Sequence, residues 1–277
     1  MGQKWGSVCR IWLAVLLSWL LGPCPAFAAP PPAQRAGLQL ARKVYNRPDG
    51  KNSSLRMTMT LVQPGSEPRV RRMFVYRRDM HGEGEESLIR FVSPSDIAGI
   101  GLLTVDHPGG ETDQWIYLPA LGRARRIASD RKGGRFVGSD FFYQDLRNRK
   151  VSKDHHRLLG TQKLDGVECK VLQSVPVNPD TSVYSKVVSW IYPTALIPLR
   201  VDFYESGRNK PIKRLTVHKL QKIQGYWTVM ESTMTDLRSG HYTRLTVQKA
   251  VYDQNLPADL FTRKVLTDPT REMPYRP

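Results

Sequence analysis

Hydrophobic and polar residues alternate with a period of two along most of the chain. Leu55, Met57, Met59 and Leu61 alternate with polar side chains, and similar short runs follow almost to the C-terminus. Serial runs of this kind are typical of an antiparallel sandwich or barrel, because antiparallel neighbours can be joined by short turns. We therefore expect a mainly β fold. Its strands should cover residues 55–61, 70–76, 88–92, 114–118, 124–128, 167–175, 183–192, 199–205, 212–220, 227–235 and 242–251.

Helical periodicity is restricted to a few segments. Over residues 34–46, Leu38, Ala41 and Val44 fall on one side of a helix. A second, short helix is expected over residues 139–146. The last apolar segment, residues 256–266, is expected to pack back on the sheet.

The first 28 residues have the three parts of a cleavable secretion signal. Lys4 and Arg10 supply the positive start, residues 11–21 are almost uninterruptedly apolar, and Ala28 ends a small-residue cleavage motif. We therefore expect cleavage between Ala28 and Ala29 and export of the mature chain. Residues 29–277 contain no obvious linker or repeat, so they should form a single domain.

Two alternatives to a cleaved signal are an uncleaved membrane anchor and a lipid attached to Cys24. The apolar run is short for a bilayer span. Pro23 stands where a small, flexible residue is expected before a lipidated cysteine. Loss of the signal leaves Cys169 alone, so the mature monomer cannot form an internal disulfide.

The charge balance is strongly positive. The chain has 42 basic and 25 acidic residues, a formal net charge of +17. A surface of this sign favours acidic partners such as anionic lipid, polysaccharide, an acidic protein face or nucleic acid. Export argues against nucleic acid, and a solvated basic surface without a specific partner is the alternative.

The segment from Asp113 to Leu146 is dense in aromatic and basic residues. On a strand, Trp115 and Tyr117 point to one face. Ile116 points to the other, so the strand is apolar on both faces and lies between two layers or between a core and a ligand. The basic residues nearby would suit a ligand with an apolar tail and an acidic head. The alternative, which the residues alone favour, is a buried core beside an ordinary basic loop.

Sequence patterns of catalysis and metal binding are absent from the chain. It contains no G-x-S-x-G, P-loop, H-E-x-x-H or paired C-x-x-C pattern. The adjacent His155 and His156 would point to opposite faces of a strand, which is poor geometry for a metal site. We therefore expect no enzyme, no metal and no cofactor. A lipid hydrolase that uses Ser139 as a nucleophile remains the enzymatic alternative.

Three ordered blocks between Leu88 and Leu146 resemble a bacterial family of outer-membrane lipoprotein-sorting proteins. The blocks are F-x-x-P-x-D-I-x-G, W-x-Y-L-P-A-L-x-R-x-R-R and G-S-D-F-x-Y-x-D-L. The closing sequence LPADLFTRKVL at residues 256–266 is similar as well. Members of this family are similar to the periplasmic lipoprotein carrier LolA and to the lipoprotein-binding protein LolB.

The resemblance implies a fold and a function. The fold is an incomplete, half-open antiparallel β-barrel, with an N-terminal helix and with short helices and loops as a lid over an apolar interior. The ligand is an acyl chain of a lipid or lipoprotein. The resemblance also implies a periplasmic location, transient contact with membranes and an inner-membrane exporter of the RND or MMPL type as a partner.

We therefore expect a monomeric periplasmic carrier that moves a lipid or lipoprotein between the inner and outer membranes. The alternative is a non-carrying adaptor that docks on an inner-membrane exporter. The expected cavity and lid residues are Trp115, Tyr117, Leu118, Leu121, Phe136 and Phe141, with Met57, Met59 and Leu61 as the opposing wall. The residues expected to contact an acidic headgroup or a partner are Arg123, Arg125, Arg126 and Arg135.

Overall fold

The computed structural model describes residues 31–80, 84–128 and 131–277. The expected secretion signal, residues 1–28 with its cleavage point before Ala29, lies outside the described residues. Residues 32–277 form a compact unit of their own. Among the described residues, no helix has the length and apolar character that a membrane span requires.

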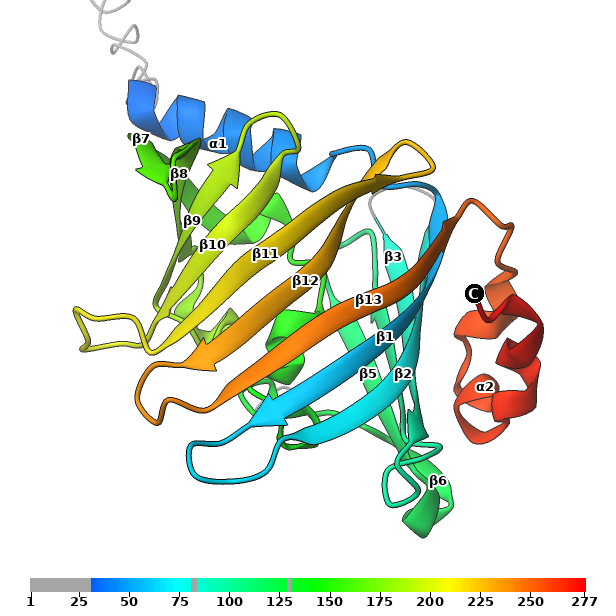
Figure 1. The fold of residues 1–277 in the computed structure, drawn as a ribbon. Helices are drawn as coiled ribbons and strands as arrows, with labels where there is room; N and C mark the ends of the chain where they lie inside the picture. Colours follow the sequence, from blue (N-terminus) through cyan, green and yellow to red (C-terminus); the bar gives the residue numbers. More distant parts are fainter. Residues whose placement is uncertain (1–30, 81–83, 129–130) are drawn as a thin grey trace, which may run out of the picture. The chain divides into compact units, whose positions relative to one another are not determined.

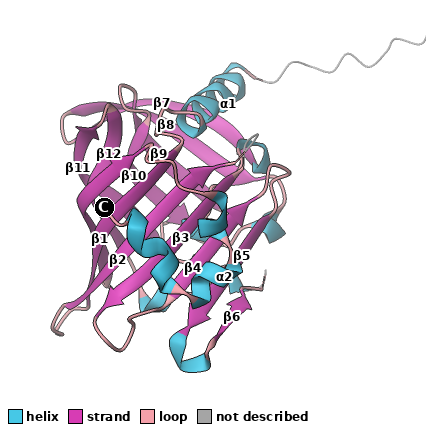
Figure 2. Cartoon of the chain, turned by 90° about the vertical axis from the view of Figure 1, so that its right-hand side faces the viewer, coloured by secondary structure: helices cyan, strands magenta, loops and turns pink. Residues whose placement is uncertain are grey.

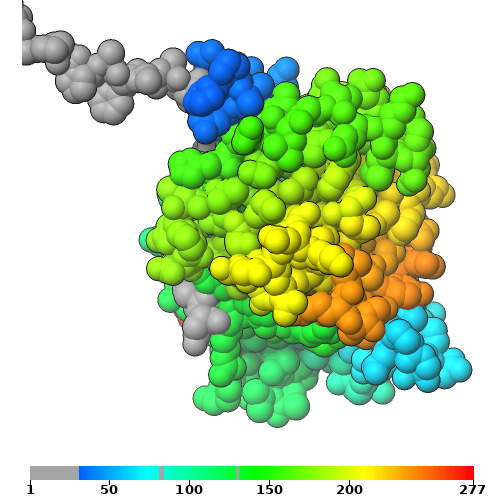
Figure 3. Space-filling view, turned by 90° about the vertical axis from the view of Figure 1, so that its left-hand side faces the viewer, coloured from blue at the N-terminus to red at the C-terminus, as the bar shows by residue number. Residues whose placement is uncertain are grey.

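Helix α1 (Pro32–Tyr45) confirms the helix expected near the N-terminus. It packs on strand β7 (Asp154–Leu164) at one edge of the sheet (Figure 3). The close approach depends on Gly37, because a Cβ at this position would lie 2.7 Å from backbone atoms of Arg157. Ala41 on the same helix is buried, so α1 is fixed to the sheet by close packing.

The described residues form one sheet of thirteen strands, and every hydrogen-bonded pair in it is antiparallel. Besides β7, the strands are β1 (Asn52–Val62), β2 (Arg69–Asp79), β3 (Glu85–Ser93), β4 (Gly101–Asp106), β5 (Thr112–Leu118), β6 (Arg123–Arg126), β8 (Val167–Pro176), β9 (Lys186–Tyr192), β10 (Ile197–Tyr204), β11 (Lys213–Ile223), β12 (Tyr226–Asp236) and β13 (Tyr242–Tyr252).

The strand order leaves the barrel open. The order is β6-β5-β4-β3-β2-β1-β13-β12-β11-β10-β9-β8-β7, so β1 and β13 pair in the middle of the sheet and β6 and β7 are its two edges (Figure 1). The expected incomplete antiparallel barrel is therefore confirmed. Because β6 and β7 are consecutive in the chain, the segment between them must run from one edge of the sheet to the other.

The structure differs from the expected elements in three places. Strand β4 was not expected, because its short apolar run lies between two glycine-rich turns. Strand β7 was not among the expected strands, because its exposed edge position removes the apolar alternation. The helix expected over residues 139–146 is instead a 3₁₀ helix confined to Tyr143–Leu146, preceded by another at Phe136–Gly138. Further 3₁₀ helices lie at Pro119–Leu121, Val151–Lys153 and Pro179–Thr181.

Two apolar clusters cover the two faces of strands β2–β5. The inner cluster lies on the concave face and comprises Met59, Leu61, Met73, Ile89, Phe91, Ile97, Ile100, Leu102, Ile116 and Phe136. The outer cluster lies on the convex face and comprises Tyr76, Leu88, Leu103, Val105, Leu256, Leu260, Phe261, Val265 and Leu266. Successive strand residues point to opposite faces, so these strands are apolar on both sides because both sides are covered.

The C-terminal segment supplies the outer cover. It consists of a 3₁₀ helix at Ala258–Phe261, helix α2 (Arg263–Thr267) and a 3₁₀ helix at Pro269–Tyr275. Figure 2 shows these short helices lying across the strands of this half of the sheet. The expectation that residues 256–266 pack back on the sheet is therefore confirmed.

Arg90 on β3 holds this C-terminal cover in place. Its side chain is 1% exposed and lies 3.2 Å from a carboxylate oxygen of Glu272. The guanidinium also donates to the backbone oxygens of Gly99, Val265 and Leu266 at 2.7–2.9 Å. Burial raises the pKa of Glu272, although the positive charge of Arg90 opposes this shift.

Replacing Arg90 by methionine should therefore destabilise the fold. Removing one partner of a buried ion pair leaves an uncompensated charge, and the free energy of unfolding should fall by about 3–5 kcal/mol. Urea unfolding of Arg90→Met measures this change. Arg56→Met, at an exposed position on β1, is the matched control and should cost about 0.5 kcal/mol or less. Equal effects of the two substitutions would contradict the anchoring role of Arg90.

Candidate functional site

The segment that joins β6 to β7, residues 127–153, crosses the concave side of the sheet; we call it the crossing segment. The structure describes its residues 127–128 and 131–153. Phe136 is fully buried in the inner cluster, with its ring centroid 5.6 Å from that of Phe91 and 5.9 Å from that of Tyr143. The first part of the crossing segment therefore fills one half of the interior.

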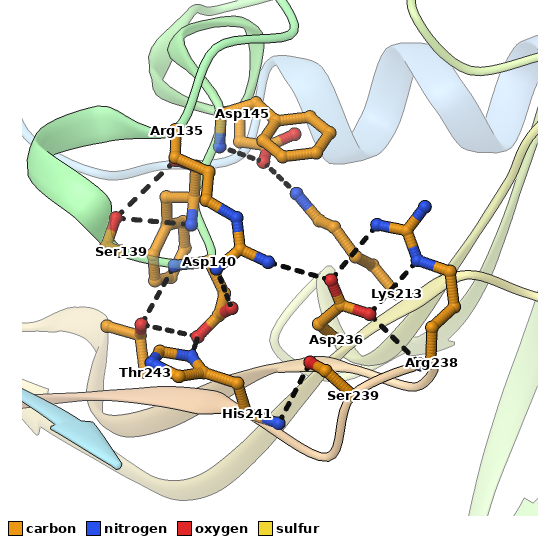
Figure 4. Close-up of polar contacts among 12 residues, drawn as sticks. Arg135, Ser139, Asp140, Asp145, Lys213, Asp236, Arg238, Ser239, His241 and Thr243 are labelled. Atoms are coloured by element: carbon orange, nitrogen blue, oxygen red, sulfur yellow. Dashed lines mark hydrogen bonds and ion pairs between the residues drawn. The ribbon is translucent and has the colours of Figure 1, made fainter. Parts of the chain in front are cut away.

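Asp140 ties the crossing segment to strand β13. Its carboxylate lies 2.5 Å from Nδ1 of His241 and accepts a hydrogen bond of 2.7 Å from the hydroxyl of Thr243. The backbone amide of Asp140 donates to the same hydroxyl at 2.9 Å. Figure 4 shows these side chains turned toward one another between the crossing segment and the sheet.

Asp145 makes a second attachment, to strand β11. The ammonium of Lys213 lies 2.6 Å from its carboxylate, and the hydroxyl of Tyr184 donates to it at 2.7 Å. Lys213 is 1% exposed, and its nitrogen lies 3.7 Å from the ring centroid of Phe142. Burial lowers the pKa of Lys213, and the charge of Asp145 opposes this shift.

Arg135 completes the framework. Its guanidinium lies 3.2 Å from Asp140 and 2.9 Å from Asp236. Burial alone would raise the pKa of Asp236, but hydrogen bonds from Arg238 and the charge of Arg135 lower it to about 2. The G-S-D-F-x-Y-x-D-L block therefore fastens the crossing segment to the sheet.

The other half of the interior contains a cavity of about 700 Å³. This volume falls within the range of about 300–1,000 Å³ that is typical of ligand pockets. Residues from both halves of the sheet contribute apolar side chains to the cavity, and helix α1 and the crossing segment contribute the rest. The apolar lining consists of Ala41, Val44, Leu55, Met57, Val75, Ile89, Leu146, Val151, Leu172, Ile191, Ile197, Trp227, Val229, Leu245 and Val247.

One border of the cavity is polar. Arg77 on β2 lies 3.3 Å from both Asp49 and Glu85. The side-chain amide of Asn148, in the crossing segment, donates to Glu85 at 3.2 Å. Burial raises the pKa of Glu85 to about 7, although Arg77 opposes the shift. A carboxyl group that titrates near neutral pH therefore lies at the edge of the apolar space.

The structure separates the expected cavity residues into three groups. Met57 lines the cavity. Met59, Leu61 and Phe136 belong to the inner cluster, and Leu118 packs against it. The remaining expected residues lie elsewhere: Trp115 and Tyr117 pack against the outer cluster, Phe141 is buried, and Leu121 is 46% exposed in a turn.

Trp115 and Tyr117 were expected at the cavity because the strand is apolar on both faces. The structure places them on the face that the C-terminal segment covers, and Ile116 between them points into the inner cluster. Sequence alternation identified the two faces, but it could not tell which face is concave.

The four expected arginines are not gathered at the cavity either. Arg123, Arg125 and Arg126 are exposed on the edge strand β6, and Arg126 pairs with Asp113. Arg135 belongs to the framework described above. The basic residues that do border the cavity are Arg47, Arg77, Arg147, Arg149 and Lys150.

Most cavity-lining residues were missed by sequence reasoning. Trp227 and Val229 on β12, and Leu245 and Val247 on β13, share the period-two alternation of their strands. That signal predicted strands, but it gave no reason to prefer these residues to other alternating positions. The pairing of β1 with β13, distant in the chain, brings Val247 beside Met57, and β12 follows next in the sheet.

The described residues give no support to a metal site or to Ser139 as a nucleophile. No group of three or more His, Cys, Asp or Glu among them could hold a metal ion. Ser139 is fully buried, with its hydroxyl within 3.5 Å of the backbone of Phe141. Its position in the framework makes it a poor candidate for a nucleophile.

Comparisons with known proteins identify similar chains. A family model described as an uncharacterized protein matches residues 83–268. An outer-membrane lipoprotein-sorting protein domain from Vibrio parahaemolyticus is 31% identical, with a TM-score of 0.80, over 84% of this chain and 99% of that chain. A DUF1329 family protein from Desulfovibrio piger is 28% identical, with a TM-score of 0.80, over the same shares of 84% and 99%.

A more distant structure supports the fold alone. A LolA superfamily protein from Nitrosomonas europaea is 20% identical, with a TM-score of 0.63, over 83% of this chain and 97% of that chain. No curated protein matches the chain.

The raised pKa of Glu85 makes a prediction about stability. The carboxyl group of Glu85 holds its proton more tightly in the folded chain than in the unfolded chain, where its pKa is about 4.5. The contribution of protonated Glu85 to the free energy of unfolding is therefore complete below pH 4.5 and is lost as the pH rises through about 7. Relative to Glu85→Gln, the wild type should lose roughly 2 kcal/mol of unfolding free energy between pH 5 and pH 8.

Urea unfolding of both proteins at several pH values measures this difference. All other titrating groups are common to the two proteins and largely cancel. A difference that does not change with pH would contradict the raised pKa.

Proposed function

The chain belongs to the LolA-like family of outer-membrane lipoprotein-sorting proteins, and from this premise we propose that it is a periplasmic lipid or lipoprotein carrier. It binds the hydrophobic part of its cargo in the cavity of about 700 Å³ and moves it between the inner and outer membranes. The single observation that carries this proposal is the cavity itself, which is lined by apolar side chains from both halves of an open barrel.

The cavity offers a sufficient driving force for binding an acyl chain. Each methylene removed from water contributes about 0.8 kcal/mol, so a chain of about twelve carbons offers roughly 10 kcal/mol before the costs of association. A membrane offers a similar amount. The net free energy of transfer between membrane and carrier is therefore small, and the cargo can move in either direction.

A carrier of this kind needs no catalytic group. It needs apolar walls that keep their shape and a border that can admit the chain. The walls here are strands tied to their neighbours by ladders of hydrogen bonds. The border is formed by α1 and the last part of the crossing segment, which contribute Val44, Leu146 and Val151 to the lining.

Filling the cavity should weaken ligand binding. Val229→Trp places a large ring in the space that an acyl chain would occupy. The neutral fluorescent probe 1-N-phenylnaphthylamine should bind at least about tenfold more weakly. Loss of buried contact equivalent to roughly two methylene groups lowers the affinity about tenfold. Fluorescence titration measures the affinity, and circular dichroism checks that the variant is folded.

Val70→Trp is the matched control, since Val70 lies on β2 and is 52% exposed. It should bind the probe as the wild type does. Native mass spectrometry of the wild type purified without detergent should also detect bound lipid. A wild type that neither carries lipid nor binds the probe would overturn the proposal.

A second candidate function is that of a non-carrying adaptor for an RND- or MMPL-type exporter. The observation in its favour is the edge strand β6, which has exposed Arg123, Arg125 and Arg126 next to its free edge. Such a basic edge suits a negatively charged protein face.

The double variant Arg125→Glu/Arg126→Glu separates the two functions. Reversal of two exposed charges should abolish capture of an exporter's periplasmic domain on the immobilised protein, while binding of 1-N-phenylnaphthylamine stays within about twofold of the wild type. Capture that survives the charge reversal would remove β6 as the docking site. Loss of probe binding would show that the substitutions disturb the fold.

A further inference from the structure

A second, polar pocket adjoins the apolar cavity. Its volume is about 390 Å³, and it lies between the β4–β5 turn and the crossing segment. Four consecutive residues, Arg147, Asn148, Arg149 and Lys150, line both spaces. The two pockets are therefore separated by one short stretch of chain and can be occupied by different parts of one ligand.

The polar pocket carries an excess of positive charge. Among its described lining residues, six are basic and three are acidic. Arg126 is compensated by Asp113, and Arg149 by Asp154 at 2.8 Å. In the part of the chain that the structure describes, Lys132, Arg147 and Lys153 have no carboxylate within ion-pair distance. The pocket therefore contains three cations without a carboxylate partner.

Arg147 is held at the boundary by a network of neutral groups. Its Nε donates to the side-chain oxygen of Gln114 at 3.0 Å. The amide nitrogen of Gln114 donates to the backbone oxygen of Tyr143 at 3.0 Å and to the hydroxyl of Thr104 at 3.2 Å. This arrangement fixes the guanidinium but uses only one of its nitrogens. The two terminal nitrogens have no hydrogen-bond partner among the described residues.

Lys153 reaches the pocket because of a glycine in the β4–β5 turn. A Cβ at Gly110 would lie 2.8 Å from Cε of Lys153. The absence of a side chain at Gly110 therefore leaves room for the lysine to lie across this turn. Gly110 also has a φ of +83°, which any other residue adopts only with strain.

The electrostatics of Arg147 and Lys132 agree with their lack of a carboxylate partner. Burial lowers the pKa of Arg147, and repulsion from Arg149 adds to this while Asp106 opposes it. Burial likewise lowers the pKa of Lys132, with further lowering by Arg147 and Arg149. Both cations are thus less stable in the folded chain than in water, and a bound anion would relieve this cost.

The acidic side chains of the pocket do not cancel this effect. Asp113 is already paired with Arg126 and lies 3.1 Å from His107. Asp106 accepts hydrogen bonds of 2.5 Å from the hydroxyl of Thr112 and of 2.8 Å from the backbone amide of Asn148. The carboxylates of Asp106 and Asp113 are thus occupied by protein donors, and Glu111, the third acidic residue, is exposed. The basic residues still outnumber the acidic ones and have donors to spare.

We propose that this polar pocket binds the anionic headgroup of the cargo, a phosphate or carboxylate, while its acyl chain lies in the apolar cavity. The inference rests on the proposed carrier function and narrows its substrate to an anionic amphiphile. Arg147 and Lys153 donate to the headgroup. The charge-assisted hydrogen bonds of a guanidinium or ammonium to such an anion are about twice as strong as neutral ones. Of the four arginines expected to contact an acidic headgroup, Arg126 lines this pocket, whereas Arg123, Arg125 and Arg135 are not among its lining residues.

Displacement of 1-N-phenylnaphthylamine from the full mature chain tests the proposal with three competitors. Decyl phosphate has both a chain and an anionic head, decanol has the chain alone, and inorganic phosphate has the anion alone. Decyl phosphate should displace the probe at a concentration about tenfold or more below that of decanol, as expected for hydrogen bonds to charged groups. Inorganic phosphate should not displace the probe at comparable concentrations.

The double variant Arg147→Gln/Lys153→Gln should remove the advantage of decyl phosphate over decanol. Its affinity for the neutral probe and for decanol should stay within about twofold of the wild type. Lys219→Gln/Lys249→Gln is the matched control, because it removes the same charge from two exposed positions on β11 and β13. The control should keep the full advantage.

The outcomes separate this inference from the carrier proposal. Equal displacement by decyl phosphate and decanol in the wild type would overturn the headgroup site and leave the carrier function intact. An advantage that survives Arg147→Gln/Lys153→Gln would also overturn it, since the charge would then act elsewhere. Displacement by inorganic phosphate as effective as that by decyl phosphate would assign the pocket to free phosphate. Failure of the wild type to bind the probe at all would overturn both proposals.

Discussion

The buried ion pair between Asp145 and Lys213 is the interaction on which the interior of this protein depends. Both side chains are almost fully removed from water, and two such charges are tolerated only when each is paired and further satisfied. Tyr184 and the backbone amide of Phe142 provide the additional donors to Asp145, and the ring of Phe142 faces the ammonium. The pair therefore fixes the crossing segment at a defined place on β11.

This attachment decides which part of the barrel is core and which part is cavity. Before Asp145, the crossing segment inserts Phe136 and Tyr143 among the apolar residues of β2–β5, where they pack in the inner cluster. After Leu146, residues 147–150 are polar and line the cavity instead of filling it. One end of the curved sheet is thus packed like an ordinary core, while the other end contains the cavity. The difference arises because the crossing segment inserts apolar side chains before Leu146 and is polar over residues 147–150.

The sequence predicted the fold better than the site. Period-two alternation, the apolar C-terminal segment and three motif blocks were sufficient for an open antiparallel barrel with a covered outer face. The alternation could not say which face is concave, so Trp115 and Tyr117 were expected at the cavity although they lie beneath the C-terminal segment. Edge strand β7 was missed because an exposed edge needs no apolar alternation.

The basic residues show a second limit of sequence reasoning. Contact with an acidic headgroup was expected of Arg123, Arg125 and Arg126, because they lie close to aromatic residues in the chain. Arg147 and Lys153 lie in a polar segment that contains no motif. The difference between them comes from partners distant in sequence: Gln114 orients Arg147, and Gly110 makes room for Lys153. Contacts of this kind depend on the strand order, which no local pattern contains.

The cavity is bounded by strands and by residues 147–150, and these two boundaries differ in how easily they can move. Most of its strand walls are held by backbone ladders, although the β12–β13 ladder ends at Glu231, so an outward movement of one strand would break several hydrogen bonds together. Residues 147–150 lie outside the sheet and are held mostly by contacts to side chains: Arg147 to Gln114, Asn148 to Asp106 and Glu85, and Arg149 to Asp154 and Thr181. Segments with few backbone hydrogen bonds open at the smallest free-energy cost. On the carrier proposal, we expect an acyl chain to enter by displacing this short polar stretch while the sheet keeps its shape. Because the same stretch lines the polar pocket, the segment expected to yield to the chain is also the one expected to meet its charged end.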